Sequence, residues 1–195
     1  MSGPLPGPDG RPRCPWALSA PGGVDYLGYH DEEWGRAVHG DAALYERLCL
    51  EAFQSGLSWL VVLRKRPRLR AAFAGFDPAA VAAFGPADVE RLLADPGVIR
   101  NRAKVEAAVA NARVVLDLGP GGLDALLWSF APDPAPPAPR TLADVPATTP
   151  ASAAMARELK RRGVRFVGPT TAHALMQATG MVDDHLAGCV ARGAR

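Results

Sequence analysis

The sequence has few cysteines, few aromatic residues and no long hydrophobic run. Three cysteines among 195 residues cannot build a disulfide scaffold, and free thiols are typical of a reducing compartment. The N-terminus lacks the apolar segment of a secretory signal peptide. The apolar run Leu57–Leu63 is closed by Arg64, Lys65 and Arg66, so it is too short to span a membrane. We therefore expect a cytoplasmic protein without a membrane role.

Length and net charge limit function only weakly, but the basic residues are clustered. A chain of 195 residues fits one domain or a domain with a small appendage, and its formal net charge is only +2. The three clusters are Arg64, Lys65, Arg66, Arg68 and Arg70; Arg100, Arg102 and Lys104; and Arg157, Lys160, Arg161, Arg162 and Arg165. They could converge on one phosphate-binding face, or they could be solvated helix ends where cations complement the dipole. The sequence leaves both interpretations open.

Helix signals dominate the chain, and no alternating strand pattern is sustained. Possible caps such as Asp41 and Ser58, and prolines at first helical positions such as Pro78 and Pro86, mark the starts. The helix after Ser58 should end before Pro67, because proline lacks a backbone donor. The expected helices cover residues 41–55, 58–66, 86–95, 101–118, 123–130, 152–162 and 170–179, with a further helix starting at 78. The predicted fold class is therefore mostly α.

Two segments are expected to lack helices. Residues 1–13 are rich in glycine and proline and are predicted to be a disordered N-terminal extension. Residues 131–140 contain five prolines and are predicted to be a linker that crosses the surface.

Residue types that bind metals stand near both ends of the chain. Cys14 and His30 lie near the front, and His185 and Cys189 form an H-x3-C pair near the back. Two cysteines and two histidines suit tetrahedral zinc, and four protein ligands would leave no open position for catalysis. The spacing alone is weak, because the same residues could be two buried thiols and two ordinary histidines.

The segment 92–104 has the pattern of a helix-hairpin-helix. Pro96 ends the first helix, Gly97 permits a tight turn, and the amides of Gly97 and Val98 could then face a DNA phosphate. Nearby positive charge would come from Arg100, Arg102 and Lys104. Such a contact would ignore base identity. A Pro-Gly turn between two helices is also common in helical bundles without DNA contacts.

Glu51 is an unusual carboxylate because it follows Leu48 by three residues and Leu44 by seven. That spacing places it on the apolar stripe of the predicted helix 41–55. A buried carboxylate either pairs with a basic residue or awaits a ligand that is cationic or rich in donors. Four aromatic residues stand nearby in the sequence: Tyr26, Tyr29, Trp34 and Trp59. They could form a flat-sided pocket around the acid, or they could simply pack the core.

Several separated motifs together resemble the constitutive bacterial 3-methyladenine-DNA glycosylases of type I. They are Cys14-x-Trp16, Tyr29-His30-Asp31-x-Glu33-Trp34-Gly35, Cys49-Leu50-Glu51-x-x-Gln54-x-Gly56-Leu57-Ser58-Trp59, Phe166-Val167-Gly168 and Asp184-His185-x-x-x-Cys189. The resemblance runs from about Cys14 to Cys189, nearly the whole chain.

This resemblance implies a helix-hairpin-helix glycosylase fold with a structural zinc ion that joins the chain ends. The implied zinc ligands are Cys14, His30, His185 and Cys189. Residues 14–195 would form one helical domain, with 14–40 and 141–195 as the zinc-stapled part and 41–130 as the part that carries the hairpin. The implied base pocket has Glu51 as its acting carboxylate, Tyr29 and Trp59 as its lining, and Tyr26 and Trp34 at or near its wall.

The implied activity is excision of 3-methyladenine from double-stranded DNA by a monomeric enzyme. The nucleotide must be flipped out of the duplex, and the cationic base would stack on the aromatic residues and meet Glu51. No lysine is proposed as a Schiff-base nucleophile, so we expect an abasic site without strand cleavage. Other aspartates and histidines are expected to be structural: Asp117, Asp124, His39 and His173. The alternatives are a glycosylase for another alkylated purine and a zinc-stapled DNA-binding module without catalysis.

Overall fold

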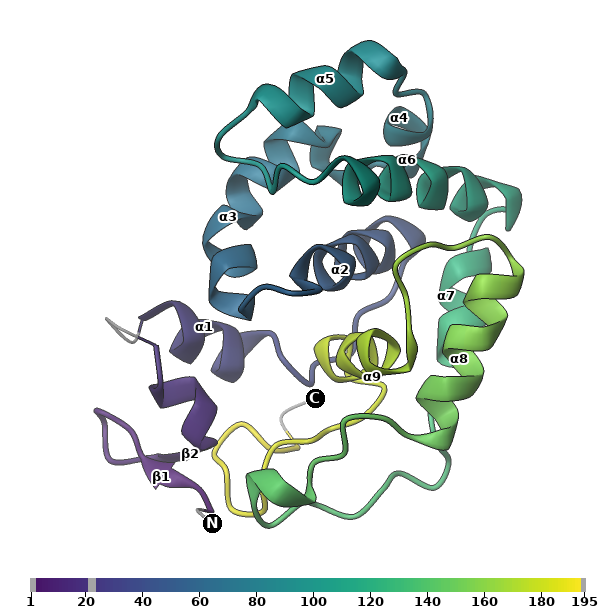
Figure 1. Ribbon diagram of the computed structural model, residues 1–195. Coiled ribbons are helices and arrows are strands. Elements are labelled where there is room, and N and C mark those ends of the chain that lie inside the picture. Colours follow the sequence, from purple (N-terminus) through teal and green to yellow (C-terminus); the bar gives the residue numbers. More distant parts are fainter. Residues whose placement is uncertain (1–2, 21–23, 194–195) are drawn as a thin grey trace.

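The computed structural model describes residues 3–20 and 24–193, and this part of the chain is mainly helical, as predicted (Figure 1). The α-helices are α1 (Val24–Glu32), α2 (Asp41–Gln54), α3 (Trp59–Ala72), α4 (Pro78–Ala82), α5 (Pro86–Ala94), α6 (Arg102–Asp117), α7 (Gly122–Trp128), α8 (Pro150–Arg161) and α9 (Pro169–Ala178). Short 3-10 helices occur at η1 (Pro15–Leu18), η2 (Ala74–Phe76) and η3 (Leu142–Asp144). Strands β1 (Leu5–Pro6) and β2 (Pro12–Arg13) form an antiparallel pair in which Leu5 lies opposite Arg13.

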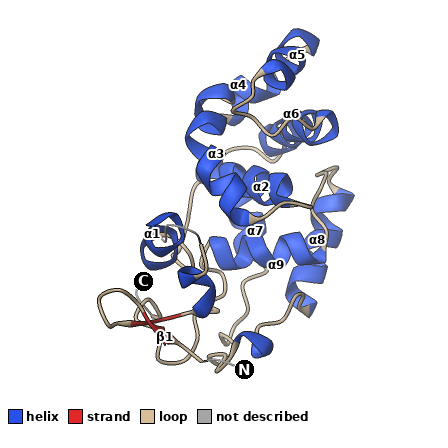
Figure 2. Cartoon of the chain, turned by 60° about the vertical axis from the view of Figure 1, so that its left-hand side comes forward, coloured by secondary structure: helices blue, strands red, loops and turns tan. Residues whose placement is uncertain are grey.

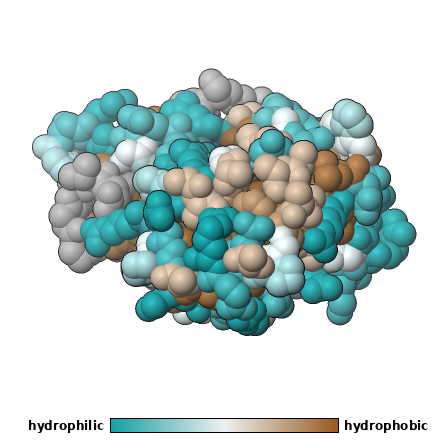
Figure 3. All heavy atoms as spheres, turned by 90° about the horizontal axis from the view of Figure 1, so that it is seen from above, coloured by the Kyte–Doolittle hydropathy of each residue, from teal (hydrophilic) through white to brown (hydrophobic). Residues whose placement is uncertain are grey.

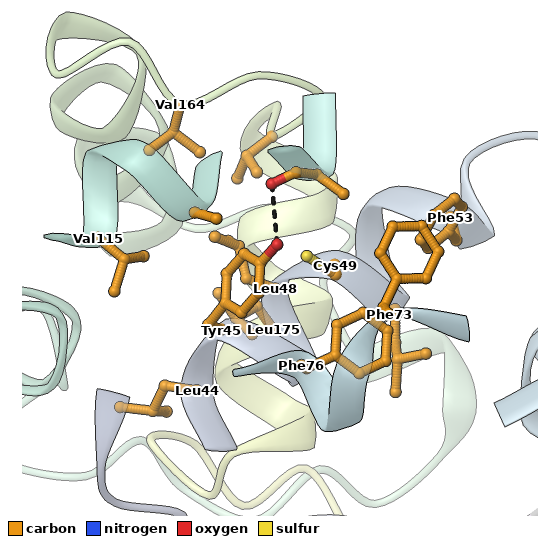
Figure 4. Close-up of a cluster of buried hydrophobic side chains, with 14 of the residues drawn as sticks. Leu44, Tyr45, Leu48, Cys49, Phe53, Phe73, Phe76, Val115, Val164 and Leu175 are labelled. Atoms are coloured by element: carbon orange, nitrogen blue, oxygen red, sulfur yellow. Dashed lines mark hydrogen bonds between the residues drawn. The ribbon is translucent and has the colours of Figure 1, made fainter. Parts of the chain in front are cut away.

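Helix α2 lies at the centre of the fold and is buried over most of its length. Figure 4 shows its side chains packed among residues from several other helices, including Leu175 of α9. The Tyr45 hydroxyl donates to the Ala108 carbonyl of α6 at 2.8 Å. Phe73 and Phe76 stack beneath α2, with ring centroids 5.4 Å apart and planes 3° from parallel. A helix with apolar residues on most sides belongs in a core, and this packing fixes the orientation of Glu51.

The two ends of the chain meet at one end of the molecule. In Figures 1 and 2, η1 and α1 lie beside the segment that follows α9, while α4, α5 and α6 lie at the opposite end, and α3 runs from α1 toward them. A small separate hydrophobic cluster joins these terminal segments through Cys14, Leu186, Cys189 and Ala191. Seen from above, the α4 and α5 end shows hydrophobic residues in the middle and hydrophilic residues around them (Figure 3). Within the described ranges, no helix combines the length and hydrophobicity needed to cross a membrane.

The prediction that a helix ends before Pro67 is wrong, because α3 continues to Ala72. Pro67 removes only the donor that would reach the Leu63 carbonyl. On either side of it, Val62 and Leu69 are completely buried, and this packing outweighs the missing hydrogen bond.

The prediction of disorder over residues 1–13 is also wrong for residues 3–13, which form the β1–β2 hairpin. Its anchor is Arg13, whose guanidinium hydrogen-bonds with Asp9 at 3.0 Å and with Asp31 of α1 at 2.8 Å. Arg13 is only 4% exposed, so this double pairing ties the hairpin to the body of the protein. Residues 1–2 lie outside the described residues. The proline-rich segment 131–140 contains no helix, as predicted.

Asp41 and Asp124 cap each other's helices. The Asp41 carboxylate accepts from the backbone amides of Gly121 and Asp124 at 2.7 and 2.9 Å, at the start of α7. In return, the Asp124 carboxylate accepts from the Gly40 amide at 2.5 Å, at the start of α2. It also lies 3.0 Å from Nδ1 of His39. Asp124 and His39 therefore have structural roles, in keeping with the sequence-based expectation.

Candidate functional site

A cavity of about 430 Å³ lies where α1, the C-terminal half of α2, the start of α3 and one face of α9 meet. Its walls include Trp16, Tyr29, Trp34, Glu51, Trp59 and His173. Four of the predicted pocket residues are therefore in one place, although they come from α1, α2, α3 and the turn after α1. The cavity is large enough for a small planar molecule.

The aromatic side chains give the cavity flat walls. Tyr29 and Trp59 have ring centroids 5.1 Å apart, and Trp16 meets Trp34 edge-on at 5.0 Å. The indole nitrogen of Trp59 is buried and has no hydrogen-bond partner among the described residues. An orphaned donor in a ligand-sized cavity is available to an acceptor on a bound molecule. Trp16 is a lining residue that the sequence-based reasoning did not assign to the pocket.

Tyr26 lies beside the cavity rather than in its lining. Its hydroxyl accepts from the Leu60 amide at 3.0 Å, in the first turn of α3. Its ring meets Trp16 edge-on at 5.7 Å. Tyr26 therefore stabilises the helix start next to Trp59 and supports one wall residue from behind.

Glu51 is the distinctive group of this cavity. Its side chain is 5% exposed, and it has no hydrogen bond or ion pair within the described part of the chain. Burial raises the pKa of Glu51 to about 8, and the charge of Arg47 offsets only part of that effect. The carboxyl group is therefore mainly protonated at neutral pH. The possibility that Glu51 is a buried salt-bridge partner has no support in these contacts.

The nearest cation is committed to another acid. Arg47 donates to Glu33 at 2.8 Å, and Arg66 of α3 donates to the same carboxylate at 2.6 Å. Burial acts to raise the pKa of Glu33, but these hydrogen bonds lower it to about 2. Glu33 thus joins the turn after α1 to α2 and α3, and it draws the Arg47 charge away from Glu51.

Three of the four predicted metal ligands share one buried site. Cys14 Sγ, His30 Nε2 and Cys189 Sγ all lie within 4.8 Å of one another. The cysteine of the C-terminal segment, Cys189, lies 3.4 Å from His30 Nε2. The fourth residue, His185, is adjacent, with its ring centroid 4.7 Å from that of His30, but its Nε2 faces the His30 carbonyl at 3.3 Å. The geometry brings both chain ends together as the motifs predicted.

The surroundings of this site suit a metal with imidazole and thiolate ligands. Nδ1 of His30 hydrogen-bonds with Asp31 at 2.7 Å, and Nδ1 of His185 hydrogen-bonds with Asp183 at 2.8 Å. Carboxylates on Nδ1 are the usual outer partners of metal-bound histidines, because they leave Nε2 free for the metal. His185 is thus held by Asp183 beside the other three residues, with its Nε2 on the side of His30.

The two thiols behave as a pair. The hydrogen bond between them and their burial raise the pKa of Cys14, whereas the same hydrogen bond lowers the pKa of Cys189 to about 4. The lowered pKa favours the thiolate form of Cys189, which is the form that binds metals.

A glycine allows His185 to approach the turn after α1. A Cβ atom on Gly35 would lie 2.8 Å from His185 Cε1, and Gly35 has a φ of +75°. Only glycine fits both the contact and the backbone angle without strain.

The hairpin between α5 and α6 uses most of its predicted DNA-binding groups internally. The Gly97 amide donates to the Asp95 side chain at 2.8 Å, and the Val98 amide donates to the Asp95 carbonyl at 3.1 Å. Gly97 has no positive φ; the reason for glycine is that a Cβ atom would overlap the side chain of Arg68. Val98 is buried. The prediction that these two amides face a phosphate is therefore wrong for this conformation.

Lys104 has a structural role that the sequence-based reasoning missed. It is 7% exposed, and its Nζ donates to the carbonyls of Phe53 and Ser55 at 3.0 and 2.5 Å. It thus caps the C-terminal end of α2 from α6. Arg102 pairs with Glu90 at 2.8 Å, whereas Arg100 is exposed and has no side-chain partner in the described residues. Of the second basic cluster, only Arg100 is left uncommitted.

His173 and Asp184 line the cavity as well, although His173 was expected to be structural. His173 Nε2 lies 3.1 Å from Asp184 Oδ2, and Gln177 donates to the same oxygen at 2.8 Å. The i, i+4 spacing of His173 and Gln177 places both on one face of α9, a signal that was present in the sequence. Their partner Asp184 lies beyond the helix, and only the fold brings it to the cavity.

Comparison with known proteins gives consistent relatives. Residues 16–192 match the family model described as methyladenine glycosylase. DNA-3-methyladenine glycosylase 1 of Escherichia coli K12 is 44% identical over 180 residues, which cover 91% of this chain and 95% of that protein. DNA-3-methyladenine glycosylase of Haemophilus influenzae is 41% identical over 188 residues, with 91% and 96% covered.

Solved structures agree with this assignment. A crystal structure of 3-methyladenine DNA glycosylase I superposes with a TM-score of 0.84 at 44% identity, covering 91% of this chain and 98% of that one. The 3-methyladenine DNA glycosylase I of Staphylococcus aureus gives a TM-score of 0.85 at 31% identity, with 92% and 96% covered. A tyrosine-to-phenylalanine variant of such an enzyme, solved in complex with 3-methyladenine, gives 0.84 at 30% identity, with 92% and 97% covered. The chain therefore belongs to the methyladenine glycosylase family.

Proposed function

We propose that this chain removes 3-methyladenine from alkylated DNA by hydrolysing the N-glycosyl bond, and that it leaves an abasic site. The observation that carries the proposal is the unpaired, buried carboxyl group of Glu51 inside an aromatic cavity of about 430 Å³. The family membership and the bound 3-methyladenine in a related structure support the same substrate.

Selection of the damaged base would rest on its positive charge. A cationic ring can stack on Tyr29 and Trp59, which contributes up to about 2 kcal/mol in a desolvated site. With a pKa of about 8, Glu51 loses its proton at neutral pH for only about 1.4 kcal/mol. The charge of the base offsets that cost, and the resulting carboxylate accepts from the exocyclic amine. Neutral adenine gains neither contribution.

The reaction itself needs little acid catalysis. When the bond between the sugar and the alkylated base breaks, the electron pair returns to the positively charged ring, so the base leaves as a neutral molecule. Water then attacks the sugar carbon. No lysine is among the described residues that line the cavity, so hydrolysis without strand cleavage is expected. The cavity would act mainly by holding the flipped nucleotide in a dry, oriented state.

A zinc ion is part of the proposal, with a structural role. Cys14, His30 and Cys189 would hold it, and His185 would be the fourth ligand. Bound zinc would join the N- and C-terminal segments. Its effect on the cavity would be indirect, because Trp16 follows Cys14 and Asp184 precedes His185, so two wall residues depend on the stapled segments.

The helix-hairpin-helix contact with duplex DNA also stays part of the proposal, in a modified form. Arg100 and the first amides of α6 are the groups of the hairpin still available for a phosphate. The enzyme is proposed to act as a monomer in the cytoplasm on double-stranded DNA.

Incubation with methylated duplex DNA, followed by chromatography of the released bases, tests the substrate. The proposal predicts release of 3-methyladenine in preference to other methylated purines. Preferential release of a different methylated base would support the alternative substrate, and the absence of any released base would support the non-catalytic DNA-binding module.

A further inference from the structure

The third basic cluster, within residues 157–165, contains three cations that pair with no acidic side chain among the residues that the structure describes. Its other two members, Arg161 and Arg162, both donate to Glu158 at 2.6 Å. In the first cluster, Arg66, Arg68 and Arg70 are likewise paired with carboxylates. The remaining members are Arg157, Lys160 and Arg165. All three are exposed, and their side chains form no ion pair or hydrogen bond with the described residues.

These three residues line a single groove of about 740 Å³ between α8 and the segment that leads into α9. Figure 1 shows this segment running from the end of α8 to the start of α9. Hydrogen bonds at 2.8 and 3.1 Å between the Arg165 backbone and the Asn111 side chain hold it against α6. None of the described residues that line the groove is acidic. Arg157 and Lys160 are three residues apart on α8, so two like charges face the same side without a counterion.

A third hollow lies between the groove and the base cavity and shares wall residues with each. This smaller hollow of about 250 Å³ shares Glu51, Gln54 and Thr170 with the cavity. At its other end it shares Ser55 and Thr171 with the groove. A chain that leaves the cavity over the 54–57 turn therefore enters the row of unpaired cations.

An exposed aromatic residue stands in the same groove. Phe166 is 40% exposed and has a φ of +60°, a value that side-chain-bearing residues rarely adopt. Strained backbone of this kind is found most often at functional sites. A positively charged groove with an exposed aromatic ring is the usual arrangement for a nucleic acid strand whose bases are unstacked.

We propose that this groove binds the phosphodiester backbone of the DNA strand next to the flipped nucleotide. Arg157, Lys160 and Arg165 would neutralise successive phosphates, and Phe166 would stack on a neighbouring base. The contact would be independent of sequence, and it would hold the strand in the orientation that delivers the nucleotide to Glu51. This inference rests on the proposed function for the identity of the nucleotide.

The test is a triple variant in which Arg157, Lys160 and Arg165 are replaced by Gln. The control is a triple variant of Arg11, Arg91 and Arg140 to Gln, because these arginines are exposed outside the groove and the charge change is the same. Affinity for a fluorescent duplex with an abasic-site analogue is measured by anisotropy at several salt concentrations. The groove variant should bind at least roughly tenfold more weakly, and its log–log salt slope should fall in magnitude by about 2 to 3. The control should keep the wild-type slope.

Equal slopes for the groove variant and the control would overturn the proposal. Lys160→Gln alone provides a second check, with an expected slope change of about 1. Phe166→Leu should weaken binding roughly tenfold through loss of stacking, and unchanged binding would contradict the aromatic contact. Single-turnover base release by the wild-type protein distinguishes a failure of the proposed glycosylase function from a failure of the proposed DNA-binding groove. Its failure would count against the proposed function, while the salt slopes would still decide the groove.

Discussion

The substitution Glu51→Gln should make the free protein more stable at alkaline pH. The folded-state pKa of Glu51 is about 8, against 4.5 for an unperturbed glutamate. A carboxyl group with a raised pKa binds extra protons in the folded state, so stability is highest below pH 4.5 and falls as the pH rises through 8. The cost reaches on the order of 5 kcal/mol above pH 8 and is below about 1 kcal/mol at pH 5. Glutamine has no such titration.

Measurement at two pH values separates the pH-dependent effect of the Glu51 charge on stability from the constant effects of the glutamine side chain. A buried amide without partners costs about 1 to 3 kcal/mol, independent of pH. We therefore compare the free energy of unfolding of Glu51→Gln with that of the wild type at each pH. From pH 5 to pH 9, this difference should shift by roughly 4 kcal/mol in favour of the variant. For a chain of this length, that corresponds to on the order of 10 °C in Tm. Urea unfolding followed by tryptophan fluorescence, with thermal unfolding in parallel, measures it.

Glu33→Gln is the matched control. Glu33 is paired with Arg47 and Arg66, and its pKa is lowered to about 2. A carboxylate whose pKa is lower in the folded than in the unfolded state stabilises the fold at every pH above its unfolded-state pKa. That contribution is lost only as the pH falls toward 2. Glu33→Gln should therefore be destabilised by a similar amount at pH 5 and pH 9. If Glu51→Gln showed the same constant loss, Glu51 would have to be a paired core residue, and the reasoning about the cavity would be refuted.

Two further predictions concern other parts of the fold. The Cys189→Ala variant should lose a bound zinc ion and melt at a lower temperature, because its C-terminal segment is released. Metal analysis combined with thermal unfolding measures both effects. A wild-type protein that is fully stable without metal would contradict the proposal that zinc joins the two chain ends. Lys104→Met should destabilise the protein by about 1 to 3 kcal/mol, because the Phe53 and Ser55 carbonyls lose their donor, yet leave the salt dependence of DNA binding unchanged. A salt slope that fell by about 1 would show that Lys104 contacts phosphate after all.

The main features of the fold and the cavity were predictable from short-range patterns. The spacing of Leu44, Leu48 and Glu51 on one helical stripe predicted a buried acid, and Glu51 is indeed 5% exposed. The motifs around Tyr29 and Trp59 predicted aromatic neighbours for that acid, and their side chains line the same cavity. Both inferences depend on helix periodicity and on motifs that stay together in the sequence.

Several errors arose where a residue's partner lies far away in the sequence. Lys104 was predicted to bind DNA from its place in a basic run, but its carbonyl partners are 49 and 51 residues distant. Asp41 was expected to cap its own helix and instead caps α7, 80 residues on. The packing that carries α3 past Pro67 likewise depends on the whole core. Local propensity cannot encode such contacts, because tertiary packing decides which of several possible partners is reached.

The pH dependence of base release tests the role of Glu51 most directly. Single-turnover release of 3-methyladenine, measured with the enzyme well below saturation so that the rate reports the free protein, should rise with pH up to about 8 in the wild-type protein and then level off, because the ionised carboxylate holds the cationic base. Glu51→Gln should release the base at least roughly tenfold more slowly and with no such rise, while its affinity for undamaged DNA stays nearly the same. A variant with wild-type rate and an unchanged pH profile would contradict the assignment of Glu51 to the recognition of the damaged base.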